Sequence, residues 1–130
     1  MKVHHFGFLT RNIEKSINEF NLLGFVELKR IIDTERKVAI SLIKSESNEI
    51  FELIEPISGN SIVSNIIEKY NNSIYHVCYL TKDINSTIEL LKQNGYILIN
   101  PPKNAILFDN KKVAFMYSKY AGMIELIEED

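Results

Sequence analysis

The order of hydrophobic and polar residues along the chain predicts strands and helices that alternate. Alternation over residues 3–10, rich in Phe, Leu and Thr, predicts a first strand. Asn12 suits a helix N-cap, and apolar residues then recur at helical spacing until Gly24 ends the helix. Three further strands are expected over residues 25–32, 38–43 and 49–55. This half therefore has the order βαβββ.

The second half of the chain predicts the same order again. A strand over residues 74–81 precedes a helix over residues 83–94 and a strand over residues 96–99. After a loop that contains Pro101 and Pro102, two last strands are expected over residues 112–118 and 123–128. Between the halves, residues 61–70 predict a short linker helix, with its apolar side formed by Ile62, Val63, Ile66 and Ile67.

The two halves are also similar residue by residue. His76 follows His5 by 71 positions, and Gly95 follows Gly24 by the same 71. The sequence Glu-Leu-Ile-Glu begins at Glu52 and returns 73 positions later at Glu125. Such an internal repeat fixes the architecture. We predict an α+β fold of two tandem βαβββ units, which form a cupped mixed β-sheet with helices on the outer face.

Length and composition are those of one small globular domain. With 130 residues, the chain is expected to form a single domain over residues 1–130, with repeat units of about 1–58 and 73–130. The net charge of −2, without a basic face, argues against nucleic acid as a partner. One cysteine, Cys78, excludes an internal disulfide and fits a reducing compartment. Because signal-peptide and membrane-span patterns are also missing, we expect a cytoplasmic protein without membrane contact.

Strand alternation places four polar residues on one side of the predicted sheet. Side chains two apart share a face, so His5 lies with Gly7, and His76 lies with Cys78. The large apolar residues Phe6, Phe8, Leu53 and Leu126 are expected to pack against the helices. The opposite, concave side then holds His5, Glu52, His76 and Glu125.

A metal ion is one explanation for two glutamates at equivalent positions in apolar strands. A buried carboxylate is costly unless it is paired or bound to a metal. Two imidazoles and two carboxylates suit one divalent ion, with Zn, Ni, Co or Mn as candidates. The alternative is a structural role, because most strand histidines and strand-end glutamates bind no metal. We expect that structural role for His4 and Cys78, and exposed positions for Glu55, Glu128 and Glu129.

Several segments together resemble the vicinal oxygen chelate superfamily, which includes glyoxalase I, bleomycin-resistance proteins and extradiol dioxygenases. These segments are HFGFLTRNIEKSINEFNLLGF, FELIEP, GNSIVSNIIEKY before YHVCYLTKDI, and KKVAFMYSKYAGMIELIE. The connector and the last segment are most similar to methylmalonyl-CoA epimerase and to glyoxalase I-like members. The resemblance implies a homodimer and the metal ligands His5, Glu52, His76 and Glu125. It further implies that the metal chelates two neighbouring substrate oxygens while Glu125 acts as ligand and base, and Glu52 as ligand and second proton carrier.

The chain departs from the family pattern at two places. The epimerase branch has an inward glutamate on its third strand, where this chain offers Ile40 or Ser41; Glu35 is a candidate substitute. The glutathione-using branch has an arginine four residues after its first histidine, where this chain has Leu9. A thiol other than glutathione, or a different oxygenated acyl substrate, is therefore expected.

Three functions follow from the resemblance. The first is a metal-dependent isomerisation of glyoxalase I type, in which a 2-oxoaldehyde–thiol hemithioacetal becomes a 2-hydroxy thioester. The second is epimerisation of a 2-methyl acyl-CoA such as methylmalonyl-CoA. The third is metal-free binding of a small molecule or drug. Ring cleavage fits less well, because those dioxygenases use two histidines and one carboxylate. The expected partner is a small-molecule hemithioacetal or thioester.

Overall fold

A computed structural model describes residues 1–61 and 63–130. Ile62, predicted on the linker helix, lies outside the described residues. The elements are, in order, β1 (Val3–Leu9), α1 (Ile13–Leu22), β2 (Val26–Asp33), β3 (Val38–Lys44), β4 (Ile50–Pro56), α2 (Ser64–Tyr70), β5 (Ser73–Thr81), α3 (Ile84–Gln93), β6 (Ile97–Ala105), a 3-10 turn (Ile106–Phe108), β7 (Lys111–Ser118) and β8 (Gly122–Glu128). They group into an N-terminal unit, residues 5–75, and a C-terminal unit, residues 1–4 with 76–130.

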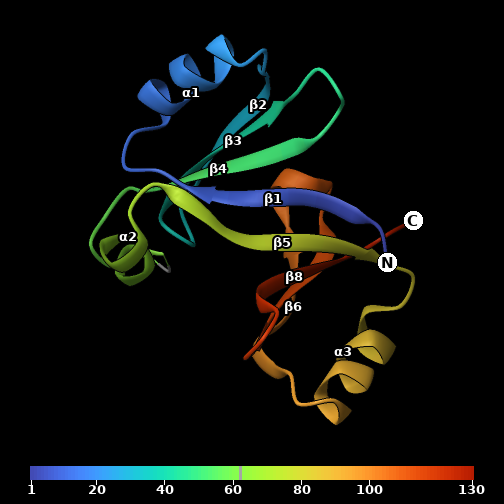
Figure 1. Cartoon of the computed structure of the whole chain (residues 1–130). Helices are drawn as coiled ribbons and strands as arrows, with labels where there is room; N and C mark the ends of the chain where they lie inside the picture. The colour runs from blue at the N-terminus through green and yellow to red at the C-terminus, as the bar shows by residue number, and fades with distance from the viewer. Residues whose placement is uncertain (62) are drawn as a thin grey trace. The chain divides into compact units, whose positions relative to one another are not determined.

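The N-terminal unit contains a mixed sheet in the order β2-β3-β4-β1. The β1 and β4 strands are parallel, and the other neighbours are antiparallel. Helix α1 lies over one face of this sheet (Figure 1). Its buried residues Ile13 and Ile17 pack with Ile43 and Leu53. Because Leu53 faces the helix, its neighbour Glu52 faces the other way.

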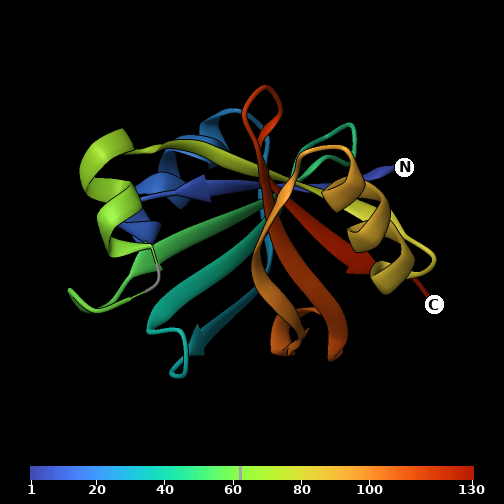
Figure 2. The ribbon, with the colours of Figure 1, turned by 90° about the horizontal axis from the view of Figure 1, so that it is seen from below.

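The C-terminal unit repeats this arrangement in the order β5-β8-β7-β6, with β5 and β8 parallel. Ile84 and Ile88 of α3 pack with Met116 and Leu126, and α3 lies beside the strands of its unit in Figure 2. The predicted α+β fold with two βαβββ units is confirmed. One detail differs, since the first residues of β1 extend this second sheet: the Leu80 amide donates to the Lys2 carbonyl at 2.8 Å.

Both long helices begin and end as the sequence predicts. The Asn12 side chain accepts from the Lys15 amide, and the Asp83 side chain accepts from the Ser86 amide. After each helix a glycine has positive φ, +90° at Gly24, the conformation that residues with a Cβ rarely adopt. Leu23 follows the last helical turn of α1 and is 71% exposed, so the apolar side of the helix ends before it.

Glu55 and Glu128 also differ from the expected exposed surface role. Each is half-buried and accepts a hydrogen bond from the first amide of a helix. Ile13 donates to Glu55 at 2.8 Å, and Ile84 donates to Glu128 at 2.9 Å. Negative charge is favourable at the N-terminal end of a helix. These glutamates therefore fasten each helix to the last strand of its own half.

The β6 strand is longer than expected. The loop predicted around Pro101 and Pro102 lies within β6, which continues to Ala105. The strand is the edge of its unit's sheet, and its pairing with β7 shifts register on both sides of Asn100. Proline is tolerated there because an edge strand leaves some amides without a ladder partner.

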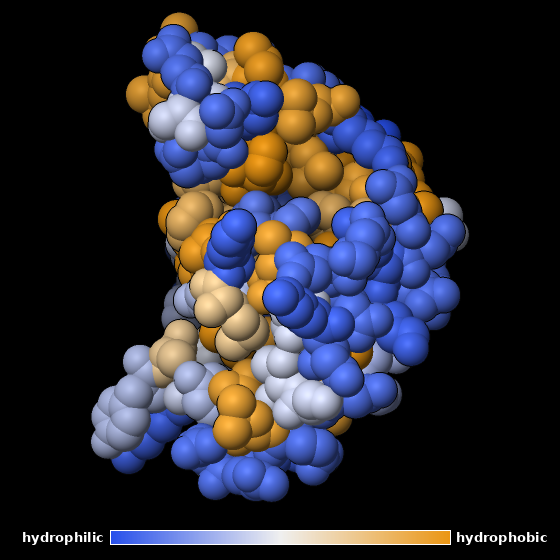
Figure 3. Space-filling view, turned by 90° about the vertical axis from the view of Figure 1, so that its right-hand side faces the viewer, coloured by the Kyte–Doolittle hydropathy of each residue, from blue (hydrophilic) through white to orange (hydrophobic). Residues whose placement is uncertain are grey.

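The surface mixes polar and apolar residues. Hydrophilic residues cover much of the face in Figure 3, with apolar patches between them. Such mixing is ordinary for a folded domain. Among the described residues, no helix is long and apolar enough to cross a membrane.

Candidate metal centre

The N-terminal unit contains one buried histidine–glutamate pair. Glu52 on β4 pairs with Gly7 on β1, and His5 lies two residues before Gly7 on the same face. The Nε2 atom of His5 is 3.7 Å from Oε1 of Glu52. His5 is 0% exposed and Glu52 is 5% exposed. The pair lies on the sheet face opposite to α1, because the alternate residues Phe8 and Leu53 face the helix.

The C-terminal unit contains the equivalent pair. Glu125 on β8 pairs with Cys78 on β5, and His76 lies two residues before Cys78. The Nε2 atom of His76 is 3.2 Å from Oε1 of Glu125, and the two residues are 2% and 4% exposed. The ring of Phe115 meets the His76 ring at 90°, with the centroids 5.1 Å apart. This aromatic contact holds the orientation of the imidazole.

The donor atoms of these pairs fit a divalent metal. Each pair offers one imidazole nitrogen and one carboxylate oxygen in a buried environment. Burial of a carboxylate is offset when it meets a positive charge or a metal. Mixed nitrogen and oxygen donors suit Zn, Ni, Co or Mn. The buried pair His5 and Glu52, and likewise the pair His76 and Glu125, could therefore provide ligands to a divalent ion.

On the third strand of each half, the residue directly opposite the glutamate is apolar. Leu42 on β3 lies directly opposite Glu52, and Phe115 on β7 lies directly opposite Glu125. Leu42 and Phe115 are 73 positions apart, the same offset as the glutamates. Sequence reasoning missed both residues, because their place depends on strand register.

The two third-strand candidates of the sequence analysis face opposite ways. Ile40 shares the face of Glu52, since it pairs with Ile54. Ser41 points to the helix side, where its hydroxyl donates to Glu27 at 2.5 Å. Glu35 is exposed in the turn between β2 and β3. The third strand therefore brings no carboxylate to the face of Glu52.

Arg30 connects β2 to the helix side of the N-terminal unit. Its guanidinium donates to Glu27 at 2.7 Å and contacts Glu14 of α1. The Arg30 hydrogen bond, helped by Ser41, holds the pKa of Glu27 below its ordinary range. The same contacts, Glu27 first, raise the pKa of Arg30. This network is separated from Glu52 by the sheet and has a structural role.

His4 and Cys78 have surroundings that fit a structural role. The His4 ring lies perpendicular to the ring of Phe108, with centroids 5.2 Å apart. Cys78 is fully buried.

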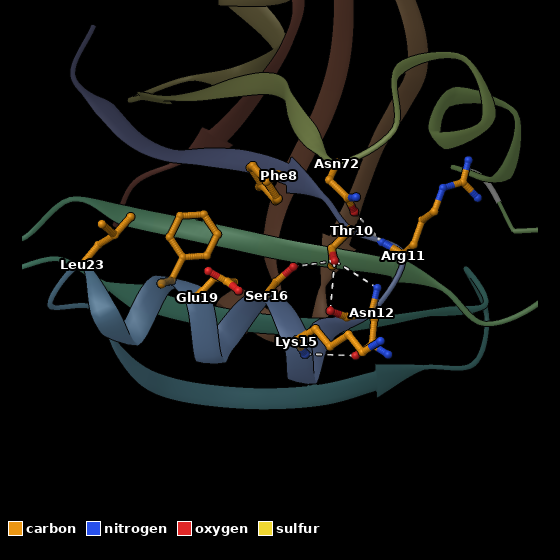
Figure 4. A pocket seen from close by; sticks show the side chains of 10 residues that line it. Phe8, Thr10, Arg11, Asn12, Lys15, Ser16, Glu19, Leu23 and Asn72 are labelled. Atoms are coloured by element: carbon orange, nitrogen blue, oxygen red, sulfur yellow. Dashed lines mark hydrogen bonds between the residues drawn. The ribbon is translucent and has the colours of Figure 1, made fainter.

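A pocket of about 490 Å³ lies on the helix side of the N-terminal unit (Figure 4). Its wall is made by α1 and the end of β1, with Phe8 and Phe20 among the lining residues. Thr10 and Ser16 share a hydrogen bond of 2.6 Å there. The Arg11 guanidinium donates to the Asn71 side chain and the Ile67 carbonyl. The pocket lies on the opposite face of the sheet from His5 and Glu52.

Comparison with known proteins agrees with this architecture. The family model described as "Glyoxalase/Bleomycin resistance protein/Dioxygenase superfamily" matches residues 4–115. The uncharacterized protein YqjC of Bacillus subtilis (strain 168) is 26% identical over 132 residues, covering 98% of this chain and 91% of YqjC.

Solved structures share the fold. The hypothetical protein BH1468 from Bacillus halodurans C-125 has a TM-score of 0.88 and 25% identity, covering 99% of this chain and 94% of that one. A Streptomyces coelicolor methylmalonyl-CoA epimerase variant in complex with 2-nitronate-propionyl-CoA has a TM-score of 0.84 and 15% identity, with 99% and 97% covered.

Proposed function

Because the chain belongs to the glyoxalase/bleomycin resistance protein/dioxygenase superfamily, we propose that it catalyses a metal-dependent proton transfer next to a carbonyl group. The reaction is of glyoxalase I type, the conversion of a 2-oxoaldehyde–thiol hemithioacetal to a 2-hydroxy thioester. The observation that carries the proposal is the pair of buried histidine–glutamate contacts, which recur at equivalent positions of the repeat. His5, Glu52, His76 and Glu125 together hold one divalent ion per chain. The chain then acts as one domain over residues 1–130.

A bound divalent ion supplies Lewis acidity, which polarises a substrate carbonyl and makes the neighbouring C–H group more acidic. His5 and His76 would each bind the ion through an imidazole nitrogen. The perpendicular contact with Phe115 supports that role for His76, because it limits rotation of the ring.

Glu125 is the proposed base. Its carboxylate takes the proton from C1 of the hemithioacetal and returns it at C2. The proton of the C1 hydroxyl passes to the C2 oxygen, so that the aldehyde-derived carbon becomes the thioester carbonyl. Glu52 is the second carboxylate ligand and carries a proton on the opposite side of the substrate. The proposed substrate is therefore a small-molecule hemithioacetal, and the thiol is not glutathione, since Leu9 is fully buried where that contact would need an arginine.

Epimerisation of a 2-methyl acyl-CoA is the second candidate. It is supported by the similarity in fold to an epimerase solved with 2-nitronate-propionyl-CoA. The apolar residues Ile40 and Leu42 on the Glu52 face of β3 favour the first candidate, because the epimerase pattern places a glutamate on this strand. A homodimer is proposed from the family resemblance alone.

The proposal is tested by assaying metal-loaded protein with methylglyoxal and a panel of thiols. Deuterium incorporation at C2 of the product, followed by NMR, reports the proton transfer directly. The Glu125→Gln variant should lose the reaction, whereas Glu68→Gln, on the exposed surface of α2, should keep it. If metal-loaded protein exchanges the 2-hydrogen of methylmalonyl-CoA and leaves all hemithioacetals unchanged, the second candidate replaces the first. If the protein retains no metal, metal-free binding of a small molecule becomes the leading function.

A further inference from the structure

The pocket on the helix side of the N-terminal unit has an apolar end. Phe8 and Phe20 are half-buried there and meet edge to face, with ring centroids 5.2 Å apart. Leu23 lines the same pocket and is 71% exposed, so most of its apolar surface is open to solvent. The volume of about 490 Å³ is within the usual range of small-molecule sites. This end can therefore take an apolar group of a small ligand.

The other end of the pocket presents hydrogen-bond donors. The Asn12 side-chain oxygen accepts from the Lys15 amide at 3.0 Å, and the Asn72 side-chain oxygen accepts from the Arg11 amide at 2.9 Å. Because these bonds use the oxygen atoms, each asparagine keeps its NH₂ group as a donor. In Figure 4 both asparagines lie at the opposite end of the pocket from Leu23. Together with the Lys15 ammonium, these donors suit a carboxylate.

An acceptor group lies between the two ends. Glu19 follows Lys15 by four positions on α1, and both side chains are exposed and line the pocket. Within the described part of the chain the two form no ion pair, in keeping with the weaker order of lysine before glutamate. The Ser16 hydroxyl, bonded to Thr10 at 2.6 Å, keeps a lone pair. A carboxylate beside a hydroxyl oxygen suits an ammonium group.

The repeat separates these charges from the requirements of the fold. The hydroxyl pair recurs in the C-terminal unit, where Thr81 and Thr87 share a hydrogen bond of 2.6 Å. The lysine and the glutamate do not recur, because Ser86 and Leu90 stand 71 positions after them. A pocket of about 440 Å³ at the equivalent strand end has no lining residue on α3 among the described residues. The fold therefore needs the hydroxyls, and the charges along α1 are a property of the N-terminal pocket.

We propose that this pocket binds an α-amino acid with a large apolar side chain. Its carboxylate meets Lys15 and the two asparagine side chains, its ammonium meets Glu19, and its side chain packs against the aromatic end. A simple carboxylic acid would leave Glu19 without a partner, and a simple amine would leave Lys15 without one. The site lies on the opposite face of the sheet from His5 and Glu52, so the proposal does not depend on metal binding.

Isothermal titration calorimetry of the full chain tests the proposal. The buffer contains EDTA, so that chelation of a metal ion by the amino acid cannot contribute. L-Phenylalanine is compared with L-phenylalaninamide, N-acetyl-L-phenylalanine and L-alanine. It should bind about tenfold more tightly than each, as one charge-assisted contact or one buried ring provides. Lys15→Gln should lose the preference over the amide, and Glu19→Gln the preference over the acetylated form.

Further variants locate the apolar contact and control for the loss of charge. Leu23→Ser should reduce the preference for phenylalanine over alanine, and its exposure makes a folding defect unexpected. Lys69→Gln and Glu68→Gln, on the exposed surface of α2, should keep every preference. In ¹⁵N NMR spectra of wild-type protein, phenylalanine should shift the amide signals of Ser16 and Asn72.

Three results would overturn the proposal. The first is wild-type protein that does not bind phenylalanine at concentrations up to about 10 mM, which corresponds to less than about 3 kcal/mol of binding free energy. The second is a set of preferences that persists unchanged in both Lys15→Gln and Glu19→Gln. The third is a Leu23→Ser variant that changes the oligomeric state in sedimentation and leaves ligand preference unchanged, which would assign the pocket to a second copy of the chain.

Discussion

The imidazole Nε2 of His76 lies 3.2 Å from the carboxylate Oε1 of Glu125, and both residues are almost completely buried. The equivalent distance from His5 to Glu52 is 3.7 Å. The glutamates also differ in their neighbours, because Glu125 lies between Cys78 and Phe115, whereas Glu52 lies between Gly7 and Leu42. These local differences allow two repeated carboxylates to take different roles.

Replacing Glu125 with Gln is expected to lower kcat for hemithioacetal conversion by about 100-fold or more, since a positioned general base contributes about 10²–10⁴-fold. Glu52→Gln should cost less, because the second carboxylate only assists the return of the proton. Both variants are compared at saturating metal, with the metal content measured. A larger loss for Glu52→Gln than for Glu125→Gln would reverse the assigned roles.

Glu55→Ala and Glu128→Ala are expected to lower the free energy of unfolding by about 1 kcal/mol each, the usual effect of losing a helix-capping contact. The reason is that the first amides of α1 and α3 lose their carboxylate acceptors. Urea unfolding measures the effect, with the exposed Glu68→Ala as control. Metal content should stay at the wild-type value; a variant that keeps full stability and loses its metal would show a site role instead.

The stability of the protein should depend on the protonation of Asp83. The Ser86 amide donates to its carboxylate, which holds the pKa of Asp83 below the ordinary value of 3.8. A depressed pKa in the folded state stabilises the protein above the unfolded pKa, and this stabilisation is lost as pH falls through the folded pKa.

Asp83→Asn should therefore be less stable than wild type at neutral pH, and the difference should narrow as pH falls below about 4. Urea unfolding at a series of pH values measures this difference. Asn12→Asp is the matched variant, because it adds a carboxylate at the equivalent N-cap of α1, where Asp83→Asn removes one from α3. A wild-type advantage that stays constant to the lowest pH would contradict the assigned cause.

The sequence predicted those features that depend on local signals or on the repeat. Asn12 and Asp83 are recognisable caps, and the offset between the halves identified equivalent histidines and glutamates. Strand alternation then predicted that Glu52 and Leu53 lie on opposite faces of the sheet. These inferences need only the periodicity of a strand or a helix.

Other features depend on tertiary structure and could not be predicted in the same way. Glu55 reaches the amide of Ile13, 42 positions earlier, only because β4 ends beside the start of α1. Pro101 and Pro102 of β6 are typical of a loop in the sequence. They fit a strand only because β6 is a sheet edge, which the sequence does not reveal. The opposition of Phe115 and Glu125 depends on the register between β7 and β8.

The most direct test of the central claim is the metal content of the protein after loading with Ni, Co, Zn or Mn and desalting. Wild-type protein, His5→Ala and His76→Ala are measured together. If the two histidine–glutamate pairs form one centre, wild-type protein should retain about one ion per chain. Each variant should then retain almost none, since the loss of one of four protein ligands weakens binding in either half. Wild-type protein without metal, or a full ion retained in either variant, would contradict the account.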